Sequence, residues 1–562
     1  MTETFVPNNG NGHRLSPLAD LATLPAGPGL IGPRTFDAAS YVKDFNENVI
    51  NAYRSGIADV ELPADMGVAR SIIAPGTAGT RDFSNLSPLV PHFIAEKCVG
   101  CMACVSSCPD SAIVATAQPK AALAEAIEGF ASVQKDPKLA AETVKAHFVH
   151  TAKYGDVPAK KGIEGADFGL FIDPMHCKGC AECVEVCAAL DHNALAMFEK
   201  CDGEPSGEAT LDRYRRDMAF YNSLPPTPVA YRNEKALADL MLGENAGGFV
   251  GGAGSCSGCG EATVVRMLMA ATLQVHGPQS MGIVAETGCN SVFGSTYPFN
   301  PYTVPWTNSL FENGPADAMG IRMRWDQAGH PERRLWVFGG DGAMFDIGFQ
   351  SLSRMVASGM DIKVLVLDSG AYSNTGGQAS TASFGGQVAK LAAYGKTEHG
   401  KSEKRKELGR ILMAHGDAYI AQVAASNINH MYKAMMEANA YPGPAVLVAY
   451  TPCMPEHGIG DDAANRQSKL AVDSRTFPLF TYDPRRGTKL SERLSLQGNP
   501  AIKEDWSKSP DGSPFDFIAF AKSEARFGQN FDKEGKASPE LEATQADRLQ
   551  NWQTLQEMAG II

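Results

Sequence analysis

The sequence lacks three features that would direct it to a membrane, a secretory route or nucleic acid. Its first residues, MTETFVPNNG, do not show the basic and then apolar pattern of a signal peptide. No apolar run approaches the roughly 20 residues that span a bilayer. Lys and Arg number 50 against 63 Asp and Glu, and the formal net charge is −13, whereas binding to phosphate backbones needs a basic face. We therefore expect a soluble, cytoplasmic protein without a membrane span or a nucleic-acid partner.

The length of 562 residues predicts several domains, and the composition changes along the chain. The sequence predicts five parts: an N-terminal arm (1–85), a ferredoxin-like domain (86–205), a linker (206–247), a cofactor-binding α/β domain (248–475) and a C-terminal docking tail (476–562). The arm is rich in Pro, Gly and Asn, with one helical stretch near 38–54. We expect it to lie on a partner surface, and the alternative is a disordered tail.

Two dense cysteine runs are the strongest signal in the chain. CVGCMACVSSCP and CKGCAECVEVCA both have the C-x2-C-x2-C-x3-C spacing of bacterial ferredoxins. In that arrangement three cysteines from one loop bind one 4Fe–4S cluster, and the fourth reaches the other cluster. The spacing predicts two ligand sets: Cys98, Cys101, Cys104 and Cys187 for one cluster, and Cys177, Cys180, Cys183 and Cys108 for the other.

A pair of zinc sites is the alternative for these runs, but zinc rarely spaces four ligands in this way. The second run has Ala188 where proline is usual, which alters a turn without removing a ligand. An Ala/Lys-rich segment between the runs predicts one or two surface helices. Cys201 is left over and is expected to be a small buried or partly exposed thiol.

The segment RRLWVFGGDGAMFDIG predicts a strand, a glycine-rich loop around Asp341 and a helix. The next strand, IKVLVLD, ends at Asp368 and is followed by SGAYSNTGGQ. A Gly-Asp-Gly followed about 30 residues later by Asn resembles the diphosphate-binding motif of thiamine diphosphate enzymes. Mg²⁺ on a diphosphate needs hard oxygen ligands, which Asp341, the Ser369 hydroxyl, the Ala371 carbonyl and Asn374 could supply.

Four further cysteines are expected to meet beside this loop. Cys256 and Cys259 open a helix, while Cys289 and Cys453 follow the strands MGIVAETGC and AVLVAYTPC. Ligands of an open parallel sheet bind outside the carboxyl ends of its strands. The four cysteines therefore predict a third 4Fe–4S site, and the alternatives are a thioredoxin-like dithiol with two unrelated buried cysteines.

From about Ser71 onward the chain resembles the C-terminal half of pyruvate:ferredoxin oxidoreductase, a thiamine-dependent 2-oxoacid oxidoreductase. The resemblance rests on the cysteine runs together with CSGCGE, TGCNSVFG, NSLFENGPADAMG, GGDGAMFDIG, LDSGAYSNTGGQAS, YPGPAVLVAYTPCMPEHGI and KLAVDSRTFPLFTYDP. It implies an α/β fold: a parallel-sheet thiamine diphosphate-binding domain, of the diphosphate-binding half, preceded by an α+β two-cluster ferredoxin-like domain.

The resemblance also implies cofactors and residue roles. It implies three 4Fe–4S clusters, Mg²⁺ and thiamine diphosphate, with Asn374 facing the substrate as the catalytic residue. Ser369 stands where threonine is more usual, which keeps the hydroxyl as a Mg²⁺ ligand beside Asp341 and Ala371. The residues implied to line the cofactor are Glu261, Cys289, Gly340, Asp341, Gly342, Ala343, Ser369, Gly370, Ala371, Tyr372, Ser373 and Asn374.

Only one of the two α/β domains that build a thiamine site is visible in the sequence. We therefore expect a partner subunit to carry the activating glutamate, most of the substrate pocket and the coenzyme A site, in a dimer of heterodimers. The expected reaction is oxidative decarboxylation of pyruvate to acetyl-CoA and CO₂, in either direction, with ferredoxin or flavodoxin as acceptor. Alternatives are the same chemistry on 2-oxoglutarate, branched-chain or aromatic 2-oxoacids, or a non-catalytic electron-transfer subunit.

Overall fold

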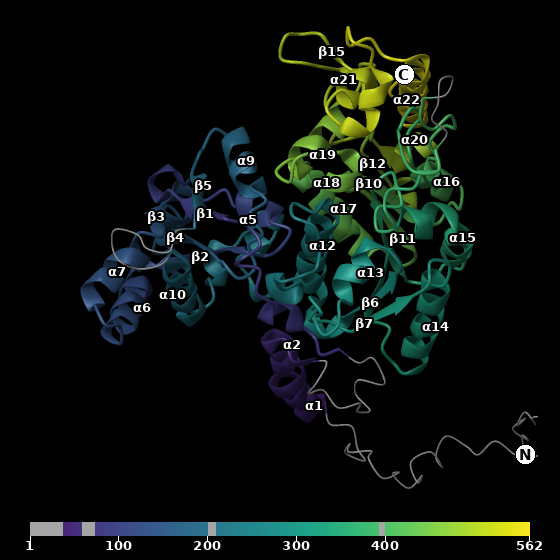
Figure 1. Ribbon diagram of the computed structural model, residues 1–562. Helices are drawn as coiled ribbons and strands as arrows, with labels where there is room; N and C mark the ends of the chain where they lie inside the picture. The colour runs from purple at the N-terminus through teal and green to yellow at the C-terminus, as the bar shows by residue number, and fades with distance from the viewer. Residues whose placement is uncertain (1–37, 59–72, 201–209, 393–398) are drawn as a thin grey trace, which may run out of the picture.

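The computed structural model describes residues 38–58, 73–200, 210–392 and 399–562. A smaller cysteine-rich region lies beside a larger α/β region, and a short helical segment lies below their junction (Figure 1). Most of the predicted N-terminal arm and Cys201 fall outside the described residues. Among the described helices, none combines the length and apolarity that crossing a membrane requires.

The N-terminal helical segment packs on the larger region of its own chain. It comprises α1 (Ala38–Asp44), a π-helical turn (Phe45–Ile50) and α2 (Asn51–Ser55), which matches the helix expected near 38–54. Phe45, Val49 and Ile50 are buried and pack with Tyr297 and Phe299. The described part of the arm therefore buries its apolar face within this chain.

The cysteine-rich region contains two small antiparallel sheets. Strand β1 (Leu89–Phe93) pairs with β5 (Leu195–Glu199), and a second sheet has the order β2-β4-β3 (Ile113–Pro119, Ala166–Ile172, Phe148–His150). The short helices α5 (Ala103–Ser107) and α9 (Glu182–Ala189) each begin inside a cysteine run. This α+β arrangement agrees with the expected ferredoxin-like domain.

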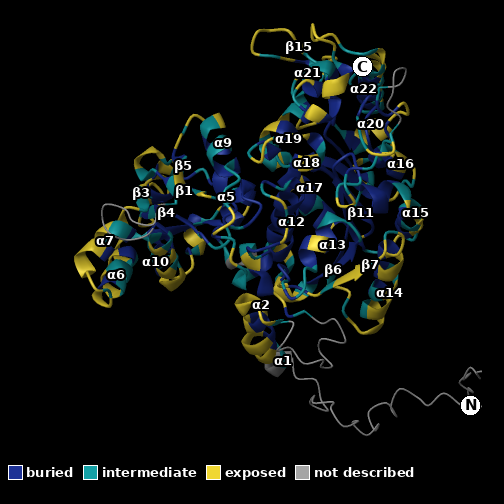
Figure 2. Ribbon diagram, viewed as in Figure 1, coloured by how far each residue is buried: buried dark blue, intermediate teal, exposed yellow. Residues whose placement is uncertain are grey.

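Two surface helices form from the Ala/Lys-rich segment. Helix α6 (Lys120–Ser132) is rich in strong helix formers. Helix α7 (Pro137–Lys145) starts with proline at its first position, and the Asp136 side chain accepts a hydrogen bond from the Leu139 N–H. Both helices expose much of their surface, unlike the central strands of the larger region (Figure 2).

The segment expected to be a linker is folded where it is described. Helix α10 (Thr210–Ser223) buries Phe220 against Leu123, Val144 and Phe171 of the cysteine-rich region. After it come a 3-10 turn (Val229–Tyr231), α11 (Leu237–Leu240) and a second 3-10 turn (Glu244–Gly248).

The larger region is an eight-stranded sheet with the order β13-β12-β10-β11-β9-β8-β6-β7. Strands β6 to β11 run parallel, as predicted, and β12 and β13 add an antiparallel edge. Their bounds are Met281–Glu286 (β6), Trp306–Ser309 (β7), Arg334–Gly340 (β8), Lys363–Asp368 (β9), Tyr419–Ala424 (β10), Ala445–Tyr450 (β11), Phe480–Tyr482 (β12) and Leu494–Ser495 (β13).

Helices cover both faces of this sheet, as parallel sheets require. Helices α12 (Gly260–His276) and α17 (Ile428–Ala440) pack on one face, in a core continuous with the cysteine-rich region. The other face carries α14 (Gly314–Gln327), α15 (Phe349–Ala357), α16 (Leu408–Met413), α21 (Phe517–Ala521) and α22 (Pro539–Met558). Short helices α13 (Cys289–Gly294), α18 (Met454–His457), α19 (Ala464–Asp473) and α20 (Leu490–Arg493) fill the loops.

The C-terminal segment, expected to be a docking tail, is docked on the sheet of its own chain. Leu541, Trp552 and Leu555 of α22 are fully buried in the core of the second face. The Trp552 indole N–H donates to the Glu504 carbonyl at 2.9 Å. This segment also supplies residues that reach the cofactor loop, as described below.

Candidate cofactor and iron–sulfur sites

The carboxyl ends of four parallel strands meet at one edge of the large sheet. Cys289 follows β6, Asp341 follows β8, Ser369 follows β9 and Cys453 follows β11. Two adjoining cavities, each of about 220 Å³, open at this edge. The crevice expected from strand order is therefore present, and it consists of two cavities with lining residues in common.

The first cavity contains most of the residues implied to hold the cofactor. Ala343 is an exception, because it is buried in the core behind the loop. Gly370 also falls outside the lining and takes a left-handed conformation with φ of 68°. The lining residues are Glu261, Thr287, Gly288, Cys289, Phe311, Gly340, Asp341, Gly342, Ile347, Ser369, Ala371, Tyr372, Ser373, Asn374 and Thr375.

Three oxygens in this cavity fit the coordination of Mg²⁺. The Ser369 Oγ lies 2.8 Å from Asp341 Oδ2 and 3.0 Å from the Ala371 carbonyl oxygen. Octahedral Mg²⁺ with bonds of 2.0–2.1 Å separates adjacent ligand oxygens by about 2.9 Å. The Ser369 hydroxyl thus lies at the spacing of an adjacent ligand from both the Asp341 carboxylate and the Ala371 carbonyl, which would leave the remaining positions for phosphate and water.

Asp341 is fully buried, and its charge is poorly compensated within the chain. Burial raises the pKa of its carboxyl well above the usual range, and the nearby Asp368 carboxylate adds to the shift. The backbone N–H groups of Ser369 and Gly370 donate to it at 3.2 and 3.0 Å, which partly offsets the burial. A bound divalent cation would supply the missing positive charge.

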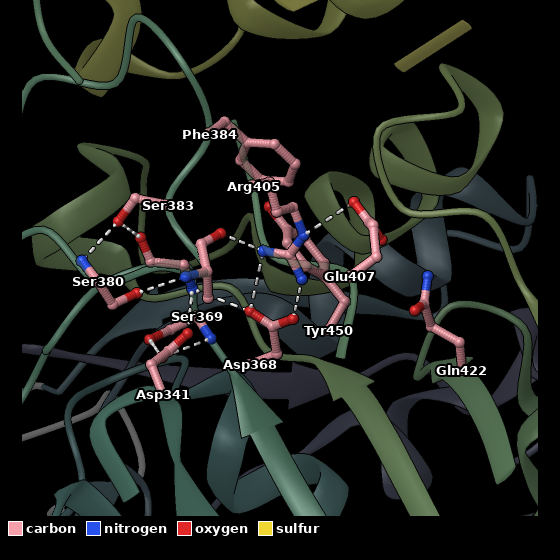
Figure 3. A network of polar contacts seen from close by, with 12 residues as sticks. Asp341, Asp368, Ser369, Ser380, Ser383, Phe384, Arg405, Glu407, Gln422 and Tyr450 are labelled. Carbon is pink, nitrogen blue, oxygen red and sulfur yellow. Dashed lines mark hydrogen bonds and ion pairs between the residues drawn. The ribbon is translucent and has the colours of Figure 1, made fainter. Parts of the chain in front are cut away.

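Asp368, the neighbouring carboxylate, already has a cation of its own (Figure 3). Arg405 forms a buried ion pair with Asp368 and donates to the Ala382 carbonyl. The Arg405 guanidinium also lies 4.8 Å from the centre of the Phe384 ring. Asp368 is therefore committed to holding the loop, and Asp341 is the carboxylate available to a metal.

A second buried network holds the back of the cofactor loop. His457 Nε2 lies 2.7 Å from the Ser369 carbonyl oxygen and must carry the proton, because a carbonyl only accepts. Arg526 donates to the same carbonyl at 3.4 Å and to the Tyr450 hydroxyl at 3.1 Å, and it pairs with Glu524 at 2.6 Å. Sequence reasoning missed these residues, since no spacing connects them to the motif.

The second cavity brings together the four cysteines of the predicted third cluster. Cys256, Cys259, Cys289 and Cys453 all line it. Burial raises the pKa of the Cys289 thiol far above its usual value, and the Glu261 carboxylate and the other three sulfurs add to the shift. Iron is the type of partner that would hold four such sulfurs as thiolates here.

The two cavities share a wall. Glu261, Cys289, Ser373 and Asn374 line both. Burial alone raises the pKa of Glu261 to about 8, and its Oε2 atom has no hydrogen-bond partner. The predicted sites for the cofactor and for the third cluster therefore share lining residues.

The ferredoxin-like region groups its cysteines in two sets. Cys98, Cys101, Cys104 and Cys187 line one small cavity of about 20 Å³. In the other set, burial raises the pKa of Cys183 well above its usual value, and the sulfurs of Cys180, Cys177 and Cys108 add to the shift. Among the described residues, no three His, Cys, Asp or Glu side chains converge closely enough to hold a single metal ion.

The three Cys-x-Gly-Cys loops share a left-handed glycine at the same position. Gly100, Gly179 and Gly258 have φ values of 72°, 71° and 71°. Met102 and Ala181, at matching positions of the ferredoxin-like loops, also have positive φ, which costs about 1–2 kcal/mol for a residue with a side chain. The left-handed glycine lets the chain turn tightly between the two cysteines of each loop.

Comparison with known proteins agrees with this division. Residues 286–449 match the model for the thiamine pyrophosphate enzyme, C-terminal TPP binding domain, and residues 97–190 match the 4Fe-4S dicluster domain. The chain therefore contains a domain of each kind. The cysteines at 256, 259 and 453 lie outside both matched segments.

Three curated relatives cover most of this chain. The probable pyruvate-flavodoxin oxidoreductase of Escherichia coli (strain K12) is 29% identical over 83% of this chain and 42% of its own length. The pyruvate:ferredoxin oxidoreductase of Moorella thermoacetica is 28% identical over 88% of this chain and 44% of its own. The pyruvate-flavodoxin oxidoreductase of Rhodospirillum rubrum is 27% identical over 83% and 41%. The chain thus spans less than half the length of these relatives.

Proposed function

We propose that this chain, which carries a thiamine pyrophosphate-binding domain and a 4Fe–4S dicluster domain, is the cofactor and electron-transfer part of a 2-oxoacid oxidoreductase. The reaction is the coenzyme A-dependent oxidative decarboxylation of pyruvate to acetyl-CoA and CO₂. Electrons leave through three 4Fe–4S clusters to ferredoxin or flavodoxin. The observation that carries the proposal is the wall shared by the Mg²⁺-type oxygen site and the four-cysteine site.

Thiamine diphosphate, when bound, supplies the electron sink that decarboxylation of a 2-oxoacid requires. Asp341, the Ser369 hydroxyl and the Ala371 carbonyl would hold Mg²⁺ against the diphosphate. Gly340 and Gly342 let the backbone approach the phosphates closely. Asn374, exposed at the mouth of both cavities, is positioned to orient the substrate.

Glu261 and Cys289 would form the boundary between carbon chemistry and electron transfer. Each of the two residues lines both cavities, so electrons would have only a short path from the cofactor site to the third cluster site. Cys256, Cys259 and Cys453 complete the cluster site on the far side of that boundary. The two ferredoxin-like clusters would then carry single electrons toward the acceptor.

A partner subunit would complete the cofactor site. Ile347 and Val292, which line the two cavities, are 53% and 46% exposed, and Leu310, next in sequence to the lining residue Phe311, is 60% exposed. Exposed apolar side chains gathered at one place mark an interaction surface. We assign this surface to a second α/β domain, carried by the partner, with the activating glutamate, most of the substrate pocket and the coenzyme A site, in a dimer of heterodimers located in the cytoplasm.

Anaerobic reduction of a viologen dye by the co-purified complex tests the activity. A panel of pyruvate, 2-oxoglutarate, branched-chain and aromatic 2-oxoacids, each with coenzyme A, should give the highest kcat/KM with pyruvate. A clear preference for another 2-oxoacid would identify that compound as the substrate of the same type of reaction. Turnover by this polypeptide alone would exclude the partner subunit.

The Cys453→Ala variant separates the enzyme from a non-catalytic electron-transfer subunit. We expect it to lose substrate-driven dye reduction while it still binds thiamine diphosphate with Mg²⁺, because Cys453 lines only the cluster cavity. Dye reduction at the normal rate would show that the four-cysteine assignment is wrong. If neither the wild-type chain nor the Cys453→Ala variant binds thiamine diphosphate, the non-catalytic electron-transfer role is favoured.

A further inference from the structure

A buried lysine joins the loops of two proposed clusters. Lys178 lies between Cys177 and Cys180, and its side chain is only 2% exposed. Its ammonium contacts Asp110 Oδ1 at 2.6 Å and donates to the carbonyls of Ala253 and Ser255 at 2.9 and 2.7 Å. Its contacts thus extend from the ferredoxin-like region to the larger α/β region.

The partners of Lys178 belong to loops that carry cluster cysteines. Asp110 comes two residues after Cys108, which joins Cys177 in the same proposed ligand set. Ser255 comes directly before Cys256, which belongs to the third set. The ion pair therefore lies between a loop of the second proposed cluster site and a loop of the third, on the route that the proposed function gives to the electrons.

Helix α12 supports the same junction from the other side. It begins directly after Cys259, and its buried Arg266 donates to the Cys108 carbonyl at 2.9 Å. The helix thus connects the third cluster loop to a ligand of the second by seven residues of rigid backbone. The junction already has a rigid link, so the Lys178–Asp110 pair is not needed to join the two regions.

Stability alone does not explain a buried ion pair at this place. Apolar side chains of similar volume often stabilise a protein as well as, or better than, a buried pair, because two charges must lose their hydration. The reduction potential of an iron–sulfur cluster, in contrast, depends directly on nearby charge and on hydrogen bonding around it.

We infer that Lys178 and Asp110 are positioning residues that set the reduction potential at the junction between the second and third clusters. The inference rests on the proposed function, which supplies the clusters. Reduction adds an electron and makes a cluster more negative, so the Lys178 ammonium favours the reduced state and the Asp110 carboxylate opposes it. In the pair, each charge limits the effect of the other.

Three variants test this inference by the sign of the shift. Lys178→Met should lower the midpoint potential of a cluster flanking the junction, and Asp110→Asn should raise it. Lys178→Arg keeps the charge and should restore the wild-type value. We expect each shift to correspond to at least a tenfold change in the reduction equilibrium, about 59 mV for a one-electron couple.

The measurement is a mediated redox titration of the complete complex, followed by electron paramagnetic resonance without any 2-oxoacid, with iron content determined on the same samples. Lys363→Met is the matched control. Lys363 is also buried, pairs with Asp361 at 2.6 Å and donates to two carbonyls, but it lies at the amino end of β9, opposite the crevice. Its replacement should leave every midpoint potential unchanged.

Unchanged potentials in both Lys178→Met and Asp110→Asn, at wild-type iron content, would overturn the inference. Shifts of the same sign in both variants would also overturn the inference. A general loosening of the loops would shift the potential in a direction that does not depend on which charge is removed. If Lys178→Met fails to retain its iron, Asp110→Asn alone decides. A higher midpoint potential in Asp110→Asn supports the inference, and an unchanged one overturns it. Wild-type protein without iron–sulfur clusters would refute the proposed function itself, a different result from clusters with unmoved potentials.

Discussion

Replacing Gly258 by alanine should remove the proposed third cluster and spare the two proposed ferredoxin-like clusters. Gly258 has φ of 71°, and a Cβ atom built on it would lie 1.9 Å from the Asp461 carbonyl oxygen. Real Cβ contacts stay beyond 3.0 Å, so the Cys256–Cys259 loop or the Asp461 backbone must move by more than 1 Å. The left-handed conformation adds about 1–2 kcal/mol. A displacement of this size in the Cys256–Cys259 loop separates two of the four sulfurs from the others.

The matched control for this variant is Gly359→Ala. Gly359 has the same φ of 71°, but nothing lies within 4 Å of its added Cβ, so the control carries the conformational penalty without the clash. The assay is iron content per chain, with urea unfolding of each variant. We expect Gly359→Ala to keep the iron of three clusters and to lose about 1–2 kcal/mol of stability, and Gly258→Ala to keep the iron of only two. Full iron content in Gly258→Ala would refute the reasoning.

Three more outcomes follow from the cofactor cavity. Ser369→Ala should raise the Mg²⁺ concentration needed for thiamine diphosphate binding about tenfold or more, measured by cofactor-induced fluorescence change; an unchanged requirement would exclude the hydroxyl as a ligand. Arg526→Met should destabilise the chain by about 3–5 kcal/mol because the buried Glu524 loses its guanidinium partner and keeps only His457 Nδ1 and the Tyr450 hydroxyl, each at 3.4 Å, and adding Glu524→Gln should recover part of the loss in urea unfolding. For Glu261, burial raises the pKa of the carboxyl from 4.5 to about 8. Between these two pH values the folded state keeps a proton that the unfolded state loses, so the free energy of unfolding should fall as the pH rises from 4.5 to about 8. Melting temperatures of Glu261→Gln should be flatter over the same range, and an equal slope would contradict the shift.

Much of the fold and site could be predicted because it depends on local spacing and on one rule of topology. Four cysteines at fixed offsets already describe a ferredoxin-like loop. Parallel strands end at one edge of a sheet, which was enough to expect Cys289, Asp341, Ser369 and Cys453 in one crevice. The apolar runs that predicted those strands are fully buried in the structure.

The remaining features depend on contacts between distant parts of the chain. Arg526 is 157 positions from Ser369, and Lys178 meets Ala253 and Ser255 across about 75 positions. No periodicity or spacing encodes such pairs. The interpretation of 476–562 as a docking tail did not include the burial of Trp552 for the same reason: the helix has polar residues on much of its surface, and it packs in the core on one face of a sheet formed by distant segments.

The distance along the chain between Ser369 and Arg526 also orders events during synthesis. At translation rates of about 5–20 residues per second, roughly 8 to 30 seconds separate the two residues as they leave the ribosome. Throughout that interval the Ser369 carbonyl lacks the guanidinium that later holds it. The cysteines of the two predicted ferredoxin-like ligand sets are all synthesised by Cys187, whereas the third predicted set is complete only at Cys453. We therefore expect the two ferredoxin-like sites to be complete before the thiamine diphosphate site.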